Sequence, residues 1–134
     1  MLARPGCRRV RDLAAGVAAL IRIDALWLCT QPQDMRAGAD RLLNIVVNTA
    51  GAAHAHHGYL FANLRATRIK LLVHDGFGVW CAARRLHVGR FVWPEHAPGD
   101  SSKATLALSA AQFEALTVGL PWQRLGELSA ITRT

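Results

Sequence analysis

Residues 67–86, TRIKLLVHDGFGVWCAARRL, decide the fold because they hold two strand-like runs joined by a turn. β-branched and aromatic residues favour strands, and the pair Asp75-Gly76 favours a two-residue type I′ turn, which needs positive φ angles. Such a turn places Val73 opposite Gly78. A four-residue loop would leave the same side chains on each face, whereas a three-residue loop would exchange the faces of one strand.

This hairpin predicts one mostly apolar face and one basic face. Leu71 shares the apolar face with Trp80, and we expect Trp80, Phe91 and Trp93 to lie in the core rather than to stack on bases. The cations of the other face are Arg68, Lys70 and Arg85.

The residues before the hairpin predict strands and a helix. Apolar side chains alternate over residues 21–30, which is typical of a half-buried strand. From Asp34 onward apolar residues recur at helical spacing, with Thr30 or Asp34 as the N-terminal cap and Gly51 as the residue that ends the helix. Residues 59–62 then form a strand beside the hairpin.

The residues after the hairpin predict further strands and a final helix. Gly89 suits a second hairpin whose outgoing strand is residues 90–93, and residues 106–108 add a short strand. Ser109 and Gln112 form a capping box at the start of the last helix, which packs on the apolar face. The predicted fold class is α+β, an antiparallel β-meander of about four to five strands with one helix before it and one helix after it.

The length of 134 residues corresponds to about one domain. We expect residues 1–20 to be a weakly ordered leader extension, residues 21–122 a single α+β domain, and residues 123–134 a C-terminal tail. The three cysteines have neither disulfide-framework nor zinc spacing, and polar residues interrupt the longest uncharged run. We therefore expect a cytoplasmic protein with no membrane partner.

Charge is the best functional signal in the sequence. The 16 Lys and Arg residues exceed the 9 Asp and Glu residues, giving a formal net charge of +7. Nearly all of these cations are arginine, which pairs bidentately with phosphate and stacks on bases, so the surplus favours a polyanionic partner. The candidate nucleic-acid-binding residues are Arg65, Arg68, Lys70, Arg84, Arg85, Arg90 and Arg36. The alternatives for them are a solvated face or a contact with acidic proteins.

Catalysis and metal binding have weaker support. A metal-dependent nuclease needs carboxylates that converge on two metal ions, but Asp34 suits a helix cap and Asp75 a turn. His54, His56 and His57 could bind a transition metal or belong to a solvated connector, and the absence of a neighbouring Cys or acidic residue in the sequence favours the connector. We predict no catalytic residue, no metal site and no cofactor.

Several separated motifs together resemble one known family. They are DMRAG at 34–38, YLF at 59–61 with Arg65, RIKLL at 68–72 followed by DGFG at 75–78, RRL at 84–86 followed by GRFVWP at 89–94, and LSAAQ at 108–112. The set spans roughly residues 21–122 and is similar to the TnpB accessory proteins of insertion sequences of the IS-sixty-six class. That family is distinct from the larger RNA-guided nuclease of the same name. The sequence departs from the family at Ala37 and Ala39, where a lysine and an aromatic residue are common.

The resemblance implies DNA recombination by transposition of a mobile element, beside a separate and larger transposase. The hypothesis is a non-catalytic transposition accessory protein that binds DNA at the element ends, the cognate transposase and other element-encoded proteins, or both kinds of partner. Two hypotheses oppose it: a metal-dependent phosphodiester-cleaving enzyme, which needs at least two acidic residues in one pocket, and a purely protein-binding adaptor. Family members usually begin near Ile21, so residues 1–20 are interpreted as an extension.

Overall fold

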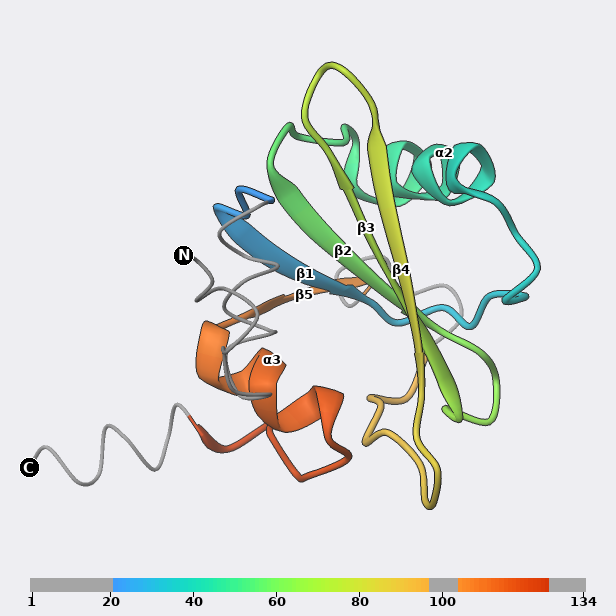
Figure 1. Ribbon diagram of the computed structural model, residues 1–134, viewed down its shortest axis with the longest axis vertical. Helices are drawn as coiled ribbons and strands as arrows, with labels where there is room; N and C mark the ends of the chain where they lie inside the picture. Colours follow the sequence, from blue (N-terminus) through green and yellow to red (C-terminus); the bar gives the residue numbers. More distant parts are fainter. Residues whose placement is uncertain (1–20, 97–103, 126–134) are drawn as a thin grey trace, which may run out of the picture.

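The computed structural model describes residues 21–96 and 104–125, which form one five-stranded sheet with two helices (Figure 1). The strands are β1 (Ala25–Cys29), β2 (His57–Ala62), β3 (Arg68–His74), β4 (Val79–Arg85) and β5 (Thr105–Leu108). The helices are α2 (Ala39–Ala50) and α3 (Ala110–Thr117), and no helix in these described ranges is long and apolar enough to cross a membrane. The leader predicted for 1–20 and most of the tail predicted for 123–134 lie outside the described residues.

The strand order is β4-β3-β2-β1-β5. Consecutive strands β2, β3 and β4 pair antiparallel and form a meander, whereas β1 pairs parallel with β2 because α2 carries the chain back to the same end of the sheet. β5 pairs antiparallel with the other side of β1. The α+β fold class is confirmed, with a sheet that is mostly antiparallel and contains one parallel pair.

Both faces of the central strands are covered, by α2 on one face and α3 on the other (Figure 1). The α2-face core consists of Cys29, Ala37, Leu42, Val46, Tyr59, Phe61 and Leu72. The α3-face core consists of Leu28, Leu60, Ala62, Ile69, Phe91, Leu108, Leu116 and Trp122. The sequence predicts a half-buried strand within residues 21–30, with one face covered. That burial is wrong, because the adjacent residues Leu28 and Cys29 lie on opposite faces and both are buried.

Helix α2 begins later than predicted. Its N-cap is Gly38, which offers no side chain, while Asp34 accepts a hydrogen bond from the backbone N–H of Arg36 at 2.9 Å within the preceding turn. Both predicted caps are therefore wrong. Gly51 ends the helix in the left-handed conformation at φ 84°, as predicted. The capping box of α3 is also confirmed, with the two expected hydrogen bonds at 3.1 and 2.9 Å.

The loop between β3 and β4 has four residues, 75–78, instead of two. Only Gly76 has a positive φ, at 88°, so the predicted type I′ turn is wrong. The Asp75 carboxylate instead fixes the loop by accepting the backbone N–H groups of Phe77 and Gly78, both at 2.9 Å. A four-residue loop leaves the same side chains on each face as a two-residue loop does. Arg68, Lys70 and Arg85 therefore share one face, as predicted.

β4 is an edge strand, and all seven of its residues are exposed. Trp80 is 50% exposed, so the prediction that it lies in the core is wrong, whereas Phe91 is buried and Trp93 is half-buried. The cores under α2 and α3 contain no buried residue of β4, which is why an apolar run on this edge strand does not mark a core.

Residues 90–93 do not form the predicted strand, so the second hairpin around Gly89 is wrong. Gly89 does adopt a positive φ of 88°. The segment after it is held by other contacts. The N–H of Phe91 donates to the carbonyl of Ala66, in the loop between β2 and β3, at 2.8 Å. The carbonyl of Val92 accepts the indole N–H of Trp122 at 2.6 Å. These contacts replace a strand ladder.

Candidate nucleic-acid interface

All seven predicted cations line three neighbouring hollows. The first hollow, about 770 Å³, lies between residues 32–36 and the loop after β2 and holds Arg36, Arg65 and Arg68. The second hollow, about 300 Å³, lies along β3 and β4 and holds Arg68, Lys70, Arg84 and Arg85. The third hollow, about 540 Å³, holds Arg65 and Arg90. Arg65 lines the first and third hollows and Arg68 lines the first and second, so the three hollows adjoin one another.

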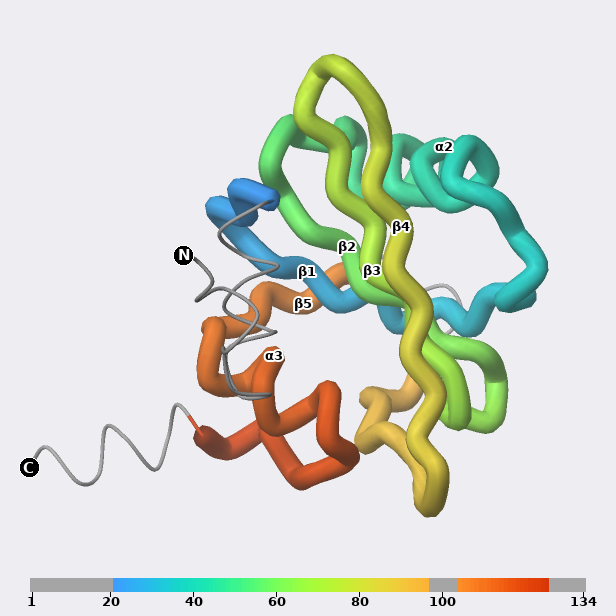
Figure 2. The backbone as a smooth tube through the Cα atoms, in the orientation of Figure 1, coloured from blue at the N-terminus to red at the C-terminus, as the bar shows by residue number. Residues whose placement is uncertain are grey.

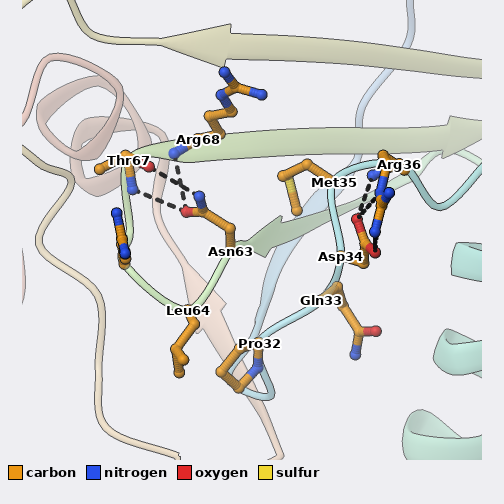
Figure 3. Close-up of a pocket in the computed structure, with 10 residues that line it drawn as sticks. Pro32, Gln33, Asp34, Met35, Arg36, Asn63, Leu64, Thr67 and Arg68 are labelled. Carbon is orange, nitrogen blue, oxygen red and sulfur yellow. Dashed lines mark hydrogen bonds and ion pairs between the residues drawn. The ribbon is translucent and has the colours of Figure 1, made fainter.

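The first and third hollows meet at the β2–β3 tip, residues 63–67, which Asn63 holds in place (Figure 3). The Asn63 side-chain oxygen accepts the backbone N–H groups of Thr67 and Arg68 at 2.9 and 3.1 Å, and its amide nitrogen donates to the Thr67 hydroxyl at 2.8 Å. The N–H of Ala66 also donates to the Asn63 carbonyl at 3.0 Å, and Ala66 has φ 55°. These four hydrogen bonds to Asn63, three of them to its side chain, thus hold the tip.

Across the first hollow, Arg36 is held by Asp34 (Figure 3). Their side chains form an ion pair at 2.9 Å while being 92% and 48% exposed. The hydrogen bonds from Arg36 lower the pKa of Asp34 to about 2. A pair this open to water contributes little stability, but it orients the guanidinium and balances part of its charge.

In the second hollow two arginines face each other across the hairpin, because Arg68 pairs with Arg85. Both are exposed, and within the described residues neither forms an ion pair with a carboxylate. Like charges directly opposite on a sheet are destabilising, so an anion between them would relieve their repulsion.

Within the described residues, Lys70 and Arg84 are the two of these cations whose side chains donate to backbone carbonyls of other segments. Lys70 is half-buried and donates from Nζ to the carbonyl of Ala37 at 2.9 Å, which ties β3 to the segment before α2. Arg84 donates from Nε to the carbonyl of Thr117 at 2.7 Å, at the C-terminal end of α3, where a cation also suits the helix dipole. These two residues are the least available to a ligand.

Residues 24–127 match a protein family described as IS66 Orf2 like protein. The chain belongs to this family. The matched range includes every strand and helix described above and all seven cations. It confirms the resemblance to the accessory proteins of this class of insertion sequence. Membership supports a role associated with the transposition of insertion sequences.

Two relatives come from Sinorhizobium fredii (strain NBRC 101917 / NGR234). The uncharacterized protein y4jC is 29% identical over 102 residues, covering 75% of this chain and 82% of that protein. The uncharacterized protein y4hO is 30% identical over 100 residues, covering 73% of this chain and 82% of that protein. No solved structure matches the chain significantly.

The histidine connector of this IS66 Orf2 like protein is packed. His57 accepts the indole N–H of Trp27 at 3.0 Å, the rings of His54 and His57 lie 5.0 Å apart, and His56 and His57 are half-buried, so a fully solvated connector is wrong. The backbone N–H of His54 donates to the Tyr59 hydroxyl at 3.0 Å. In the part of the chain that the structure describes, no group of three His, Cys, Asp or Glu side chains could hold a metal ion.

The sequence interpretation missed Asn63, which shapes the first hollow, and Met35, which lines the first and second hollows. A signal for Asn63 was present, because Asn at the start of a short loop between two strand runs is typical of a turn in which its side chain bonds the backbone two or more residues on. Met35 is the first of the apolar residues that recur at helical spacing after Asp34, and nothing in its spacing distinguishes it from the residues that follow.

Proposed function

We propose that this IS66 Orf2 like protein is a non-catalytic accessory protein of transposition, acting in the cytoplasm, that binds duplex DNA of the element through the three hollows. The observation that carries the proposal is the gathering of all seven cations in three adjoining hollows that share Arg65 and Arg68. Duplex DNA carries about one negative charge per 1.7 Å of its axis, so phosphates fit such a surface.

The balance of charge on this surface supports an anionic partner. Among the described residues that line the three hollows, the carboxylates are Asp34 and Glu95. Asp34 is already paired with Arg36, which leaves the other arginines largely uncompensated. Phosphate contacts of this kind fix the position of a protein on DNA without reading its sequence.

The contacts of three of the described carboxylates support a non-catalytic role. Phosphodiester cleavage by metal ions needs carboxylates that converge on the metals. Here Asp24 pairs with Arg22, Asp34 pairs with Arg36, and Asp75 holds a turn. We therefore place the chemistry of transposition in the separate transposase.

A salt titration of DNA binding tests the proposal. We expect the double variant Arg65→Gln and Arg68→Gln to weaken binding and to lower the log–log salt slope by about 1.8, since each lost phosphate contact contributes about 0.9. The matched control, Arg41→Gln with Arg124→Gln, removes the same charge from exposed arginines that line none of the three hollows. Equal slopes for both double variants, or no binding of the natural protein at low salt, would contradict the proposal.

A second candidate function is contact with the transposase, which the edge strand β4 favours. All seven residues of β4 are exposed, and residues 79–83 carry no charge, so the edge lacks the usual protection against added strands. Pull-down of the cognate transposase, with and without terminal DNA, tests this contact. We expect Cys81→Lys to reduce capture without weakening DNA binding, and undiminished capture would count against the strand-edge contact.

A further inference from the structure

The β2–β3 tip presents an apolar side chain that the fold does not use. Leu64 is 84% exposed, although the hydrogen bonds of Asn63 hold the loop around it in one conformation. In Figure 3 its side chain points away from both Asn63 and Arg68. The tip therefore holds a large apolar side chain in a fixed position, open to contact from outside the molecule.

The surroundings of Leu64 indicate what it contacts. Leu64 lines the first and third hollows, so it stands where the two meet. Arg36 and Arg68 lie in the first hollow, Arg90 lies in the third, and Arg65 lies in both. The tip is therefore a protrusion with an apolar end and cations on both sides.

The minor groove of a DNA duplex has the complementary form, because stacked bases with apolar faces lie between two rows of phosphates. Proteins that bind the minor groove frequently insert an apolar side chain, often leucine, between base steps and so kink the duplex. We infer that Leu64 is such a wedge: it enters the minor groove and bends the DNA while arginines of the first and third hollows hold the phosphates on either side. This inference rests on the proposed DNA binding and adds a mode of binding to it.

The loop contacts make the tip suitable for this role. Ala66 keeps a left-handed φ of 55° and its carbonyl accepts the N–H of Phe91 at 2.8 Å, which anchors the tip to the α3-face core. A wedge must resist being pushed back when it separates stacked bases. The anchoring supplies that resistance.

Bending of a DNA duplex labelled at both ends with a fluorescence energy-transfer pair tests the inference. We expect the natural protein to shorten the end-to-end distance. Leu64→Ala should abolish the shortening and weaken binding about tenfold, equivalent to about 1.4 kcal/mol, while the salt slope stays unchanged because no charge is lost. Leu64→Met should restore the bend, since methionine is also a long apolar side chain.

Phe77→Ala is the matched control, because Phe77 is 100% exposed on a hairpin loop that lines none of the three hollows. It should bind and bend DNA as the natural protein does. DNA that is bound but not bent, or bent equally by Leu64→Ala, would overturn the wedge and leave the proposed DNA binding intact. Failure of the natural protein to bind DNA at low salt would overturn both. Loss of transposase capture by Leu64→Ala with unchanged DNA bending would make the tip a protein contact instead.

Discussion

The β2–β3 tip and the β3–β4 tip, residues 75–78, lie at opposite ends of the sheet and are built in the same way (Figure 2). Each begins with a residue whose side-chain oxygen accepts two backbone N–H groups, Asn63 in one and Asp75 in the other. Each exposes one large apolar residue, Leu64 or Phe77. The three hollows and their arginines adjoin the first of the two and not the second. Exposure alone therefore does not distinguish a contact surface from an ordinary loop.

The tips also differ in where they place the positive φ angle. In the β3–β4 tip it falls on Gly76, which has no Cβ to oppose it, whereas in the β2–β3 tip it falls on Ala66. A left-handed non-glycine residue costs roughly 1–2 kcal/mol and persists only where the surrounding contacts over-determine it. The β2–β3 tip therefore depends more heavily on its hydrogen bonds.

The largest expected effect follows from this dependence. Asn63→Ala removes three side-chain hydrogen bonds of a half-buried residue and should lower the free energy of unfolding by about 2–3 kcal/mol, at about 1 kcal/mol for each bond. Asp75→Ala should cost less because water replaces its bonds. Urea denaturation measures both changes. Asn63→Asp, which keeps the acceptors and loses the donor, should fall between Asn63→Ala and the natural protein, and equal losses at Asn63 and Asp75 would remove the contrast.

Substitutions at the two positive-φ residues test the same difference between the tips. Gly76→Val should lower the free energy of unfolding by roughly 1–2 kcal/mol from its positive φ alone, because a Cβ there meets no atom within 4 Å. Ala66→Gly should change stability by less than that, since relief of strain is offset by the greater freedom of glycine in the unfolded chain. Thermal unfolding of the two variants checks the difference. An unchanged midpoint for Gly76→Val would show that the loop adopts another conformation.

The two tips also show how far the sequence could predict this fold. The Asp75-Gly76 pair located the hairpin, and the parity of its loop was enough to place Arg68, Lys70 and Arg85 on one face. The loop length was wrong because the Asp75 side chain, rather than a pair of positive φ angles, closes the turn.

Longer-range features could not be predicted, because a strand's pattern does not reveal its partners. The apolar alternation of residues 21–30 counted only one face of β1, while Leu26 and Leu28 form part of the opposite core. Residues 90–93 have strand-like composition, but their partners are a loop carbonyl and the Trp122 side chain. The hollows gather cations that are up to 54 residues apart, as Arg36 and Arg90 are, which only the three-dimensional structure could show.

On the basic face next to the β2–β3 tip, we expect Lys70 to contribute to stability and Arg68 to contribute to DNA binding. Lys70→Met removes the bond to the Ala37 carbonyl and should lower the free energy of unfolding by about 1 kcal/mol with little change in the salt slope. Arg68→Gln should do the reverse and lower the slope by about 0.9. Paired denaturation and titration experiments check both variants. The triple change of Arg68, Lys70 and Arg85 to Gln removes three cations. Because Lys70 is bonded to the Ala37 carbonyl, we expect that change to remove only about two phosphate contacts.

The smallest expected effect is a response to acid that only one tip should show. The backbone N–H groups of Phe77 and Gly78 hold the pKa of Asp75 below its ordinary value of 3.8. Because the folded pKa is the lower one, the stabilisation is fully present above the ordinary pKa and is lost as the pH falls through the folded pKa. The amide side chain of Asn63 does not titrate, so the β2–β3 tip should keep its hydrogen bonds over the same range.

Amide hydrogen exchange and chemical shifts between pH 7 and pH 2 measure this difference. We expect the N–H groups of Phe77 and Gly78 to lose protection on acidification before those of Thr67 and Arg68 change. Asp75→Asn should make the first pair respond to pH like the second, since an amide oxygen can accept the same bonds without a proton equilibrium. Simultaneous loss at both tips would mean that acid acts on the whole sheet, and the carboxylate of Asp75 would then not be what separates the two tips.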